Sequence, residues 1–377
     1  MTHRERFQAV IEGEIPDRLP WTPRLELWYR AHNTQGNLPP KYAGKTLAQI
    51  REMLNCGHPG RENPLFKSVM RNVEIIEKDM DSTLLKTYIT PVGEVSELYR
   101  VDKEAKSKGY SLADGQAEYM VKDRASYDVV RHILENIEYV PMYDEFTAYQ
   151  TNEVGDNGEC VPSTGYDPTG YDPFYRLMEK IVGLSYVYYH LADYPDQMEM
   201  LYHTMWENQR KLWKVLVESS AKTIIHGSHY DSLMTPPPIF KKYMLPYLKE
   251  LSKLMHDHGK RLAIHADADS KLLLELYMEA GVDVMDCYCT APMAKVTMEE
   301  TIDRIGDKMV IWGGIPSNLL VPEATPYKTF REYIDNYFDL LKKRRCRVIV
   351  AVADNVVAEA DIERVEEISD KVDKFRF

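Results

Sequence analysis

Short apolar runs alternate with helical segments in the second part of the chain, from residue 222 onward. The predicted strands are 222–226, 261–264, 282–285, 308–312 and 346–352. Helical segments of ordinary length separate these runs, and the last run is followed by a predicted helix. A strand–helix–strand crossover places its two strands parallel to each other. The pattern therefore predicts a parallel α/β fold.

The first half of the chain follows a different pattern. Residues 1–15 predict an amphipathic helix that ends before Pro16, and 18–26 predict an extended segment. From 69 to 125 apolar and polar residues alternate, which is typical of antiparallel strands with one exposed face. Further helices are predicted over 128–136, 173–184 and 195–219.

Two stretches depart from the strand–helix alternation. Residues 33–64 are rich in Gly, Pro and Asn around one short helix at 46–54, which predicts a helical lid. Residues 80–125 hold most of the predicted antiparallel strands. We expect a single domain over 1–377 that carries these two stretches as insertions.

Composition and charge narrow the functional classes. The 377 residues include 47 basic and 59 acidic side chains, a net charge of −12, which argues against nucleic acid or an anionic membrane surface as the main partner. Five cysteines, an odd number, do not predict a disulfide framework. The charged N-terminus predicts no signal peptide, and the chain has no run of about 18 apolar residues, so we expect a cytoplasmic protein without a membrane span.

Potential metal ligands follow two neighbouring predicted strands. His265 and Asp267 come after the first, and Asp286, Cys287 and Cys289 come after the second. In a (β/α)8 barrel these strand ends form the face that carries the active site. As alternatives, His265 forms a hydrogen bond at a strand end, Asp267 caps the next helix, and the cysteines are buried and inert.

The loop after strand 222–226 contains His226, His229 and Asp231. Two histidines and an acid could bind a metal ion without His265, or they could form a polar wall for a substrate.

Other candidates follow the first extended segment and the last strand. Arg24 is expected to bind substrate, and Glu26 is either a catalytic acid or the ion-pair partner of Arg24. Asp354 and Asn355 are expected to be a ligand and a substrate anchor, or else an Asx turn. Aromatic residues expected to line a pocket, or else to fill the core, are Tyr166, Tyr171 and Trp312.

Five motifs, in order along the chain, resemble the uroporphyrinogen decarboxylase superfamily. They are RERFQAVIEGEIPDRLP, SHYDSLMTPPPIFKKYMLPYLKEL, IHADADSKLL, WGGIP and ADNVVAEADIERV. The resemblance covers essentially the whole chain and implies a (β/α)8 TIM barrel with the N-terminal insertions described above.

Within that superfamily the chain is most similar to the corrinoid-dependent methyltransferases. The decarboxylases carry Arg-Gln-Ala-Gly-Arg after the first strand, whereas this chain has Trp-Thr-Pro-Arg-Leu-Glu. The methyltransferases bind zinc through His-x-Cys and a distant cysteine; here the corresponding residues are His265-x-Asp267 and Asp354. The resemblance thus implies a zinc site with ligands among His265, Asp267, Cys287 and Asp354.

The ADNVVAEADIERV ending resembles the O-demethylase members most. It implies transfer of a methyl group from a methoxylated aromatic compound to a corrinoid, with metal or acid assistance from His265, Asp267, Asp354 or Glu26. The chain lacks the Asp-x-His-x-x-Gly motif of a corrinoid carrier, so the cobalamin must be supplied by a separate corrinoid protein. Alternatives are a porphyrinogen-type decarboxylase, a methylcobamide:thiol methyltransferase and a non-catalytic binding barrel; a homodimer is possible.

Overall fold

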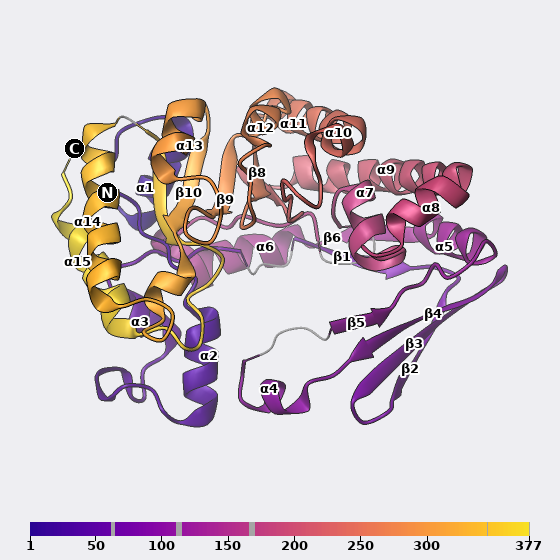
Figure 1. Cartoon of the computed structure of the whole chain (residues 1–377), viewed down its shortest axis with the longest axis horizontal. Coiled ribbons are helices and arrows are strands. Elements are labelled where there is room, and N and C mark those ends of the chain that lie inside the picture. The colour runs from indigo at the N-terminus through magenta and orange to yellow at the C-terminus, as the bar shows by residue number, and fades with distance from the viewer. Residues whose placement is uncertain (62–64, 111–114, 166–169, 345, 377) are drawn as a thin grey trace. The chain divides into compact units, whose positions relative to one another are not determined.

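A computed structural model describes residues 1–61, 65–110, 115–165, 170–344 and 346–376 (Figure 1). The chain divides into two compact units. The first comprises Met1–Asn63, Phe146–Pro162 and Ala221–Phe377, and the second comprises Pro64–Glu145 and Ser163–Ser220.

The first unit contains a five-stranded parallel sheet in the order β11-β10-β9-β8-β7. Its strands are β7 (Thr223–His226), β8 (Arg261–His265), β9 (Val284–Tyr288), β10 (Val310–Ile315) and β11 (Val348–Val352). Every residue of β7, β9, β10 and β11 is buried, which explains the continuous apolar runs in the sequence. The predicted parallel α/β arrangement is confirmed, although β9 extends three residues beyond its predicted end.

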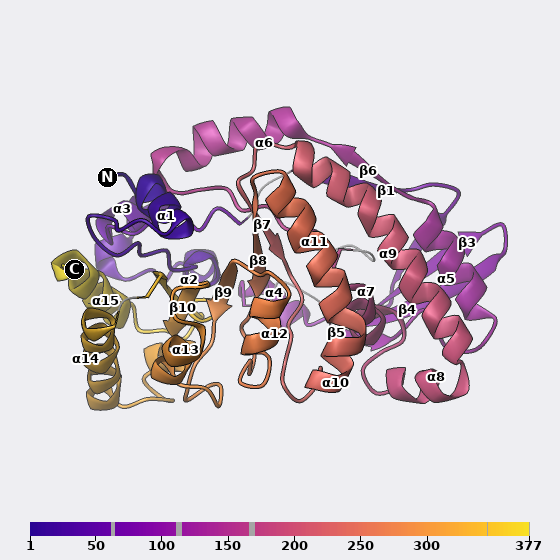
Figure 2. The same cartoon turned by 90° about the horizontal axis from the view of Figure 1, so that it is seen from above.

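Helices follow these strands in turn (Figure 2). They are α10 (Pro237–Ile239), α11 (Leu245–Asp257), α12 (Leu274–Glu279), α13 (Met298–Ile305), α14 (Tyr327–Lys343) and α15 (Ile362–Lys374). A π-helical segment at Phe240–Met244 precedes α11, and a 3-10 turn at Ser317–Leu320 precedes α14. Thr297 and Asp361 cap α13 and α15 by accepting hydrogen bonds from backbone N–H groups, so both helices begin where the sequence offers a side-chain acceptor.

The N-terminal part of this unit is helical. It contains α1 (His3–Glu12), α2 (Glu26–Gln35), a 3-10 turn (Pro40–Tyr42) and α3 (Leu47–Met53). Thr2 and Thr46 form capping boxes at α1 and α3, which were both predicted. Helix α2 was not predicted, because its first residue, Glu26, was assigned to the end of an extended segment.

Three extended segments connect β11 to β7 through isolated backbone hydrogen bonds. Thr22 N–H donates to the carbonyl of Val350 at 3.0 Å, and Gly57 N–H donates to that of Trp21 at 2.7 Å. Val161 N–H then donates to the carbonyl of Gly60 at 2.8 Å, and Ile225 N–H to that of Pro162 at 2.9 Å. The segments around residues 20–22, 57–60 and 157–162 therefore follow one another between the two outer strands of the sheet.

Trp312 lies in the core of the first unit. The residue is 1% exposed, and its ring meets Phe7 edge to face with ring centroids 4.9 Å apart. The indole Nε1 donates to Thr22 Oγ1 at 2.7 Å. The residues buried with it are Val10, Ile11, Val161, Ile225, Ala263, Val284, Val310, Ile349 and Ala351. Trp312 is thus a core residue. This was the alternative to its predicted role in lining a pocket.

The second unit contains an antiparallel sheet in the order β2-β3-β4-β5 (Figure 1). Its strands are β2 (Glu74–Asp79), β3 (Thr83–Thr90), β4 (Gly93–Arg100) and β5 (Gly115–Glu118). The antiparallel strands predicted from the alternating pattern are confirmed. A second antiparallel pair, β1 (Phe66–Met70) with β6 (Ile137–Pro141), was not predicted, because its strands are far apart in the sequence.

Helices of the second unit include the long α9 (Pro195–Glu218). The others are α4 (Lys103–Ser107), α5 (Ser126–Glu135), α7 (Pro173–Arg176) and α8 (Val187–Asp193), with a π-helical segment at Leu177–Ile181. Helix α6 (Tyr143–Tyr149) spans the boundary between the units and is followed by short turns at Gln150–Val154 and Gly155–Asn157. Among the described residues, none of the helices combines the length and the apolar character needed to cross a bilayer.

Candidate functional site

His265 ends strand β8 and lies between two carboxylates. Its Nε2 is 3.3 Å from Asp267 Oδ2, and its Nδ1 is 3.4 Å from Asp286 Oδ2. The imidazole side chain is only 7% exposed. Asp286 is the register partner of His265 on the adjacent strand β9, so the parallel pairing of the two strands itself brings these side chains together.

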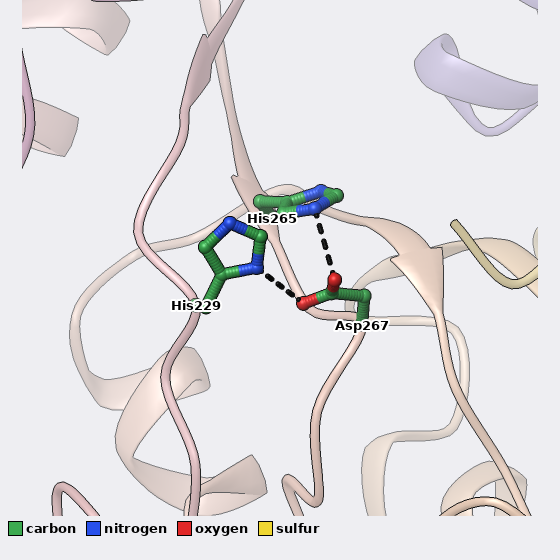
Figure 3. Close-up of side chains that lie close together, drawn as sticks. All are labelled: His229, His265 and Asp267. Atoms are coloured by element: carbon green, nitrogen blue, oxygen red, sulfur yellow. Dashed lines mark hydrogen bonds and ion pairs between the residues drawn. The ribbon is translucent and has the colours of Figure 1, made fainter. Parts of the chain in front are cut away.

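His229 completes a second contact to Asp267, as Figure 3 shows. Its Nδ1 donates to Asp267 Oδ1 at 2.8 Å, while Oδ2 of the same carboxylate faces His265. The two imidazole rings meet edge to face with centroids 4.6 Å apart. His229 comes from the loop after β7 and is partly exposed, so the cluster has an open side and a buried side.

The charged forms of His265 and Asp267 stabilise each other. Burial alone would lower the pKa of His265, but hydrogen bonds with Asp267, Asp286 and Cys287 raise it well above its usual value. Burial would raise the pKa of Asp267, but its hydrogen bonds with His229 and His265 hold it far below its usual value. In the absence of a bound ion, the arrangement therefore favours an imidazolium at His265 beside an ionised Asp267.

Arg61 occupies the buried side of the cluster. Its Nη2 is 2.6 Å from Asp286 Oδ2 and 3.3 Å from His265 Nδ1, and its Nη1 is 2.9 Å from Cys287 Sγ. Burial opposes ionisation of Asp286, but the positive charge of Arg61 holds the pKa of that carboxyl below its usual value. Arg61 thus compensates a carboxylate that has no exposed surface.

Cys287 turns toward this site because the backbone is irregular at its position. It has φ 52°, and the pairing register of β9 with β10 shifts between Trp312 and Gly313. The thiol lies 3.5 Å from the carbonyl oxygen of Asp354. Cys289 instead contacts the carbonyl of Thr290, and burial raises the pKa of its thiol to about 12.

Arg24 and Asp354 form an ion pair beside the cluster. Arg24 Nη1 is 2.8 Å from Asp354 Oδ1, and the same oxygen lies 3.9 Å from His265 Nε2. Burial would lower the pKa of Arg24, but the neighbouring Cys287 and Asp354 raise it above its usual value. Asp354 also has a left-handed backbone, φ 58°, and its Oδ2 accepts a hydrogen bond from Asn355 Nδ2 at 2.8 Å.

Two candidates from the loop after β7, His226 and Asp231, have other partners. His226 is fully buried beside the rings of Tyr230 and Tyr247, and burial lowers its pKa to about 3. Asp231 accepts hydrogen bonds from the backbone N–H groups of Leu233, Met234 and Asp269, so it organises loops.

Glu26 pairs with Arg51, rather than with Arg24 as the sequence suggested. Of the predicted aromatic residues, Tyr166 lies outside the described residues. Tyr171 is buried in the second unit, where Arg176 lies over its ring.

Arg61 was missed by the sequence reasoning because it falls in the stretch read as a lid. The chain reaches it through Gly60, which has φ +64°. A Cβ atom at Gly60 would lie 1.8 Å from the carbonyl oxygen of Glu159, so only glycine permits this close approach. The Gly-Arg pair in HPGRE was the available signal, but its importance depends on a contact with a segment about a hundred residues away.

Among the residues that the structure describes, two overlapping groups of side chains could hold a metal ion. One consists of His229, His265 and Asp267, and the other of His265, Asp286 and Cys287. Within each group the potential ligand atoms lie within 4.8 Å of one another. His265 belongs to both groups, because its two nitrogens face opposite sides of the cluster.

Comparisons with known proteins agree with this architecture. The family profile described as Uroporphyrinogen decarboxylase (URO-D) matches residues 175–375, more than half of the chain. A solved structure of a methyltransferase from Methanosarcina mazei has a similar fold, with a TM-score of 0.55 over 100% of this chain and 99% of that chain at 12% sequence identity. A comparison with curated protein sequences gives no match. The profile match, together with the five parallel strands it includes, shows that this chain belongs to the uroporphyrinogen decarboxylase family.

Proposed function

We propose that the protein is a methyltransferase that moves a methyl group from a methoxylated aromatic compound to the cobalt of a separate corrinoid protein. The observation that carries the proposal is the His229–Asp267–His265 cluster at the carboxyl ends of β7 and β8. The family assignment and the fold likeness to a methyltransferase support the same class of reaction.

The barrel implied by the family supports this location of the site. In the proposed (β/α)8 barrel, strands β7 to β11 would be five of the eight barrel strands. The segments around residues 20–22, 57–60 and 157–162 connect β11 to β7 and supply the remaining three in the proposed fold. Arg24, Arg61, His265 and Asp354 would then all follow barrel strands, on the face where such barrels carry their active sites.

A zinc ion fits the donor set of the open side. Catalytic zinc is held by three protein ligands, two histidines and a carboxylate being one such set, and keeps a fourth position open. Bond lengths of about 2.0–2.2 Å in tetrahedral geometry place ligand atoms about 3.3–3.6 Å apart. The 3.3 Å between His265 Nε2 and Asp267 Oδ2 matches that spacing, and Asp354 Oδ1 is 3.9 Å from the same nitrogen.

The chemical task is to make an aryl ether oxygen a better leaving group. During transfer the reduced cobalt of the corrinoid protein would supply the electron pair of the new cobalt–carbon bond, while the bond between the methyl carbon and the oxygen breaks and its electron pair stays on the oxygen as a phenolate. A bound zinc ion would stabilise that charge as a Lewis acid. Without the ion, the protonated His265 could donate a proton to the same oxygen, because its pKa is raised. Asp267 and Asp286 hold the ring in place in either case.

The pairing of the arginines near the site supports methyl transfer over decarboxylation, because a substrate with many carboxylates would need several unpaired cations. Arg61 pairs with the fully buried Asp286, and Arg24 pairs with Asp354. Arg61 is thus engaged by the protein itself. Arg24 is partly exposed and could exchange Asp354 for one carboxylate of a methoxybenzoate.

The test combines the purified protein, a reduced corrinoid protein and a series of methoxybenzoates. The expected result is methylation of the corrinoid, seen in its absorption spectrum, with release of the matching phenol. Chelator treatment should slow the reaction and Zn²⁺ should restore it; an unchanged rate after complete zinc removal would assign the role to His265 as an acid. Absence of methyl transfer with every substrate and carrier tried would contradict the proposal.

A further inference from the structure

The two possible metal groups compete for His265, and each uses a different nitrogen of the ring. Nε2 faces Asp267 on the open side, next to His229. Nδ1 faces Asp286 on the buried side, next to Cys287. A single ion of the size of Zn²⁺ binds through one nitrogen, so the protein must favour one side.

The buried side already holds a positive charge. The guanidinium of Arg61 contacts both potential anionic ligands there, at 2.6 Å from Asp286 Oδ2 and 2.9 Å from Cys287 Sγ. Its side chain is 9% exposed and that of Asp286 is 0% exposed. Because arginine stays protonated in proteins, a divalent cation would have to displace this group or lie against it in a poorly solvated environment.

Asp286 is then available for a different role. A histidine that binds a metal commonly donates its other ring N–H to a carboxylate, which fixes the orientation and tautomer of the ring. Asp286 Oδ2 is 3.4 Å from His265 Nδ1, and the strand pairing of β8 with β9 fixes its position. Arg61 in turn fixes the carboxylate.

We infer that Arg61 excludes metal from the Asp286–Cys287 side, so that the ion binds to His229, His265 Nε2 and Asp267, with Asp286 positioning His265 from behind. Cys287 is therefore not a ligand. His229 is the third ligand instead of the Cys287 that the sequence analysis predicted. The inference rests on the metal centre of the proposed function but not on the methyl donor or the corrinoid protein.

Cobalt substitution tests the ligand set without any activity assay. The full-length protein, freed of metal, is titrated with Co²⁺, which has visible absorption bands that Zn²⁺ lacks. The expected spectrum shows ligand-field bands without the charge-transfer absorption of a cobalt–thiolate bond, and Cys287→Ser leaves it unchanged. His229→Ala should abolish stoichiometric binding. A thiolate band in the wild-type protein that disappears in Cys287→Ser would overturn the inference.

A double variant tests the positioning role of Asp286. Arg61→Met/Asp286→Asn removes both buried charges together and so avoids leaving one uncompensated. We expect a melting temperature close to that of the wild type and a Kd for Co²⁺ about 10- to 100-fold higher, as is usual when the carboxylate behind a metal-binding histidine is lost. Unchanged affinity would overturn the role of Asp286. Failure of the wild-type protein to bind Co²⁺ would overturn the whole inference, whereas acid-assisted methyl transfer would survive that result.

Discussion

His265 and Asp286 are direct register partners on adjacent parallel strands, and their side chains meet at 3.4 Å between Nδ1 and Oδ2. Side chains at one level of a parallel ladder point to the same face. Since β8 and β9 are both buried, the ladder holds this pair more rigidly than a loop could. The partly exposed His229 and Asp267 are then positioned against a rigidly held His265.

Removal of the His265 imidazole should abolish most of the proposed methyl transfer. For His265→Ala we expect a rate loss of about 10²- to 10⁴-fold, since both the proton donor and a metal ligand disappear. The matched control is His256→Ala, because His256 is also paired with an aspartate, Asp283, but lies at the surface. Equal losses in the two variants, measured as initial rates of corrinoid methylation, would contradict a role for His265.

Replacement of Gly60 by alanine should be more destabilising than the same change at Gly44. Both glycines have positive φ, 64° and 71°, so both substitutions carry a conformational cost of about 1 kcal/mol. Only at Gly60 does the new Cβ meet backbone, 1.8 Å from the carbonyl oxygen of Glu159, whereas Gly44 has nothing within 4 Å. Thermal unfolding of the two variants gives the comparison, and similar melting temperatures would argue against the tight contact.

The glycine variant should be the more stable of the two at position 287, and the alanine variant the more stable at position 289. At Cys287, with φ 52°, Cys287→Gly should be more stable than Cys287→Ala by about 1 kcal/mol, because glycine tolerates a left-handed backbone. At the buried Cys289, alanine should be the more stable replacement. Both variants at a position lose the thiol, so the difference between their free energies of unfolding does not include that loss. The same order at both positions in denaturant unfolding would be inconsistent with a strained Cys287.

The buried His226 should make the protein less stable in mild acid. Burial lowers its pKa to about 3 in the folded state, whereas the unfolded chain has the ordinary value of about 6.5. Between these two values the unfolded chain binds a proton that the folded protein does not. Stability is therefore unaffected above about pH 6.5 and falls as the pH drops toward 3, by up to about 1.4 kcal/mol per pH unit from this group.

The variant His226→Asn should reduce that dependence on pH. Melting temperatures measured between pH 7 and 5 should fall less steeply in the variant than in the wild type, whatever its stability at pH 7. Parallel slopes would mean that His226 is protonated in the folded state or remains accessible to solvent. His265 acts in the opposite direction, since its raised pKa stabilises the folded state at low pH.

The parallel sheet and part of the site could be predicted because they depend on local sequence. A buried parallel strand is a short apolar run, and the residue that follows it lies at the common edge of the sheet. His265 and Asp267 were placed together by this rule, and Asp354 lies beside them. The roles assigned to these residues stay predictions until the experiments above are done.

The remaining features depend on contacts that no local pattern encodes. Arg61 reaches the site only because Gly60 lies against Glu159. Cys287 faces the site only because the β9–β10 register shifts next to Gly313. The pairing of β1 with β6 is equally non-local, because the two strands are far apart in the chain and no local pattern identifies them as partners.

The isolated hydrogen bonds between β11 and β7 have a consequence for how the site responds to a ligand. Arg24 follows a segment that is tied to its neighbour by a few such bonds, whereas His265 and Asp286 belong to a continuous ladder. The Arg24 side chain can therefore shift with small backbone adjustments, whereas the His265 imidazole and the Asp286 carboxylate, which Arg61 contacts, are held more firmly. If the proposed function holds, the side chain that binds a charged group of the substrate is thus held less rigidly than the side chains that assist methyl transfer.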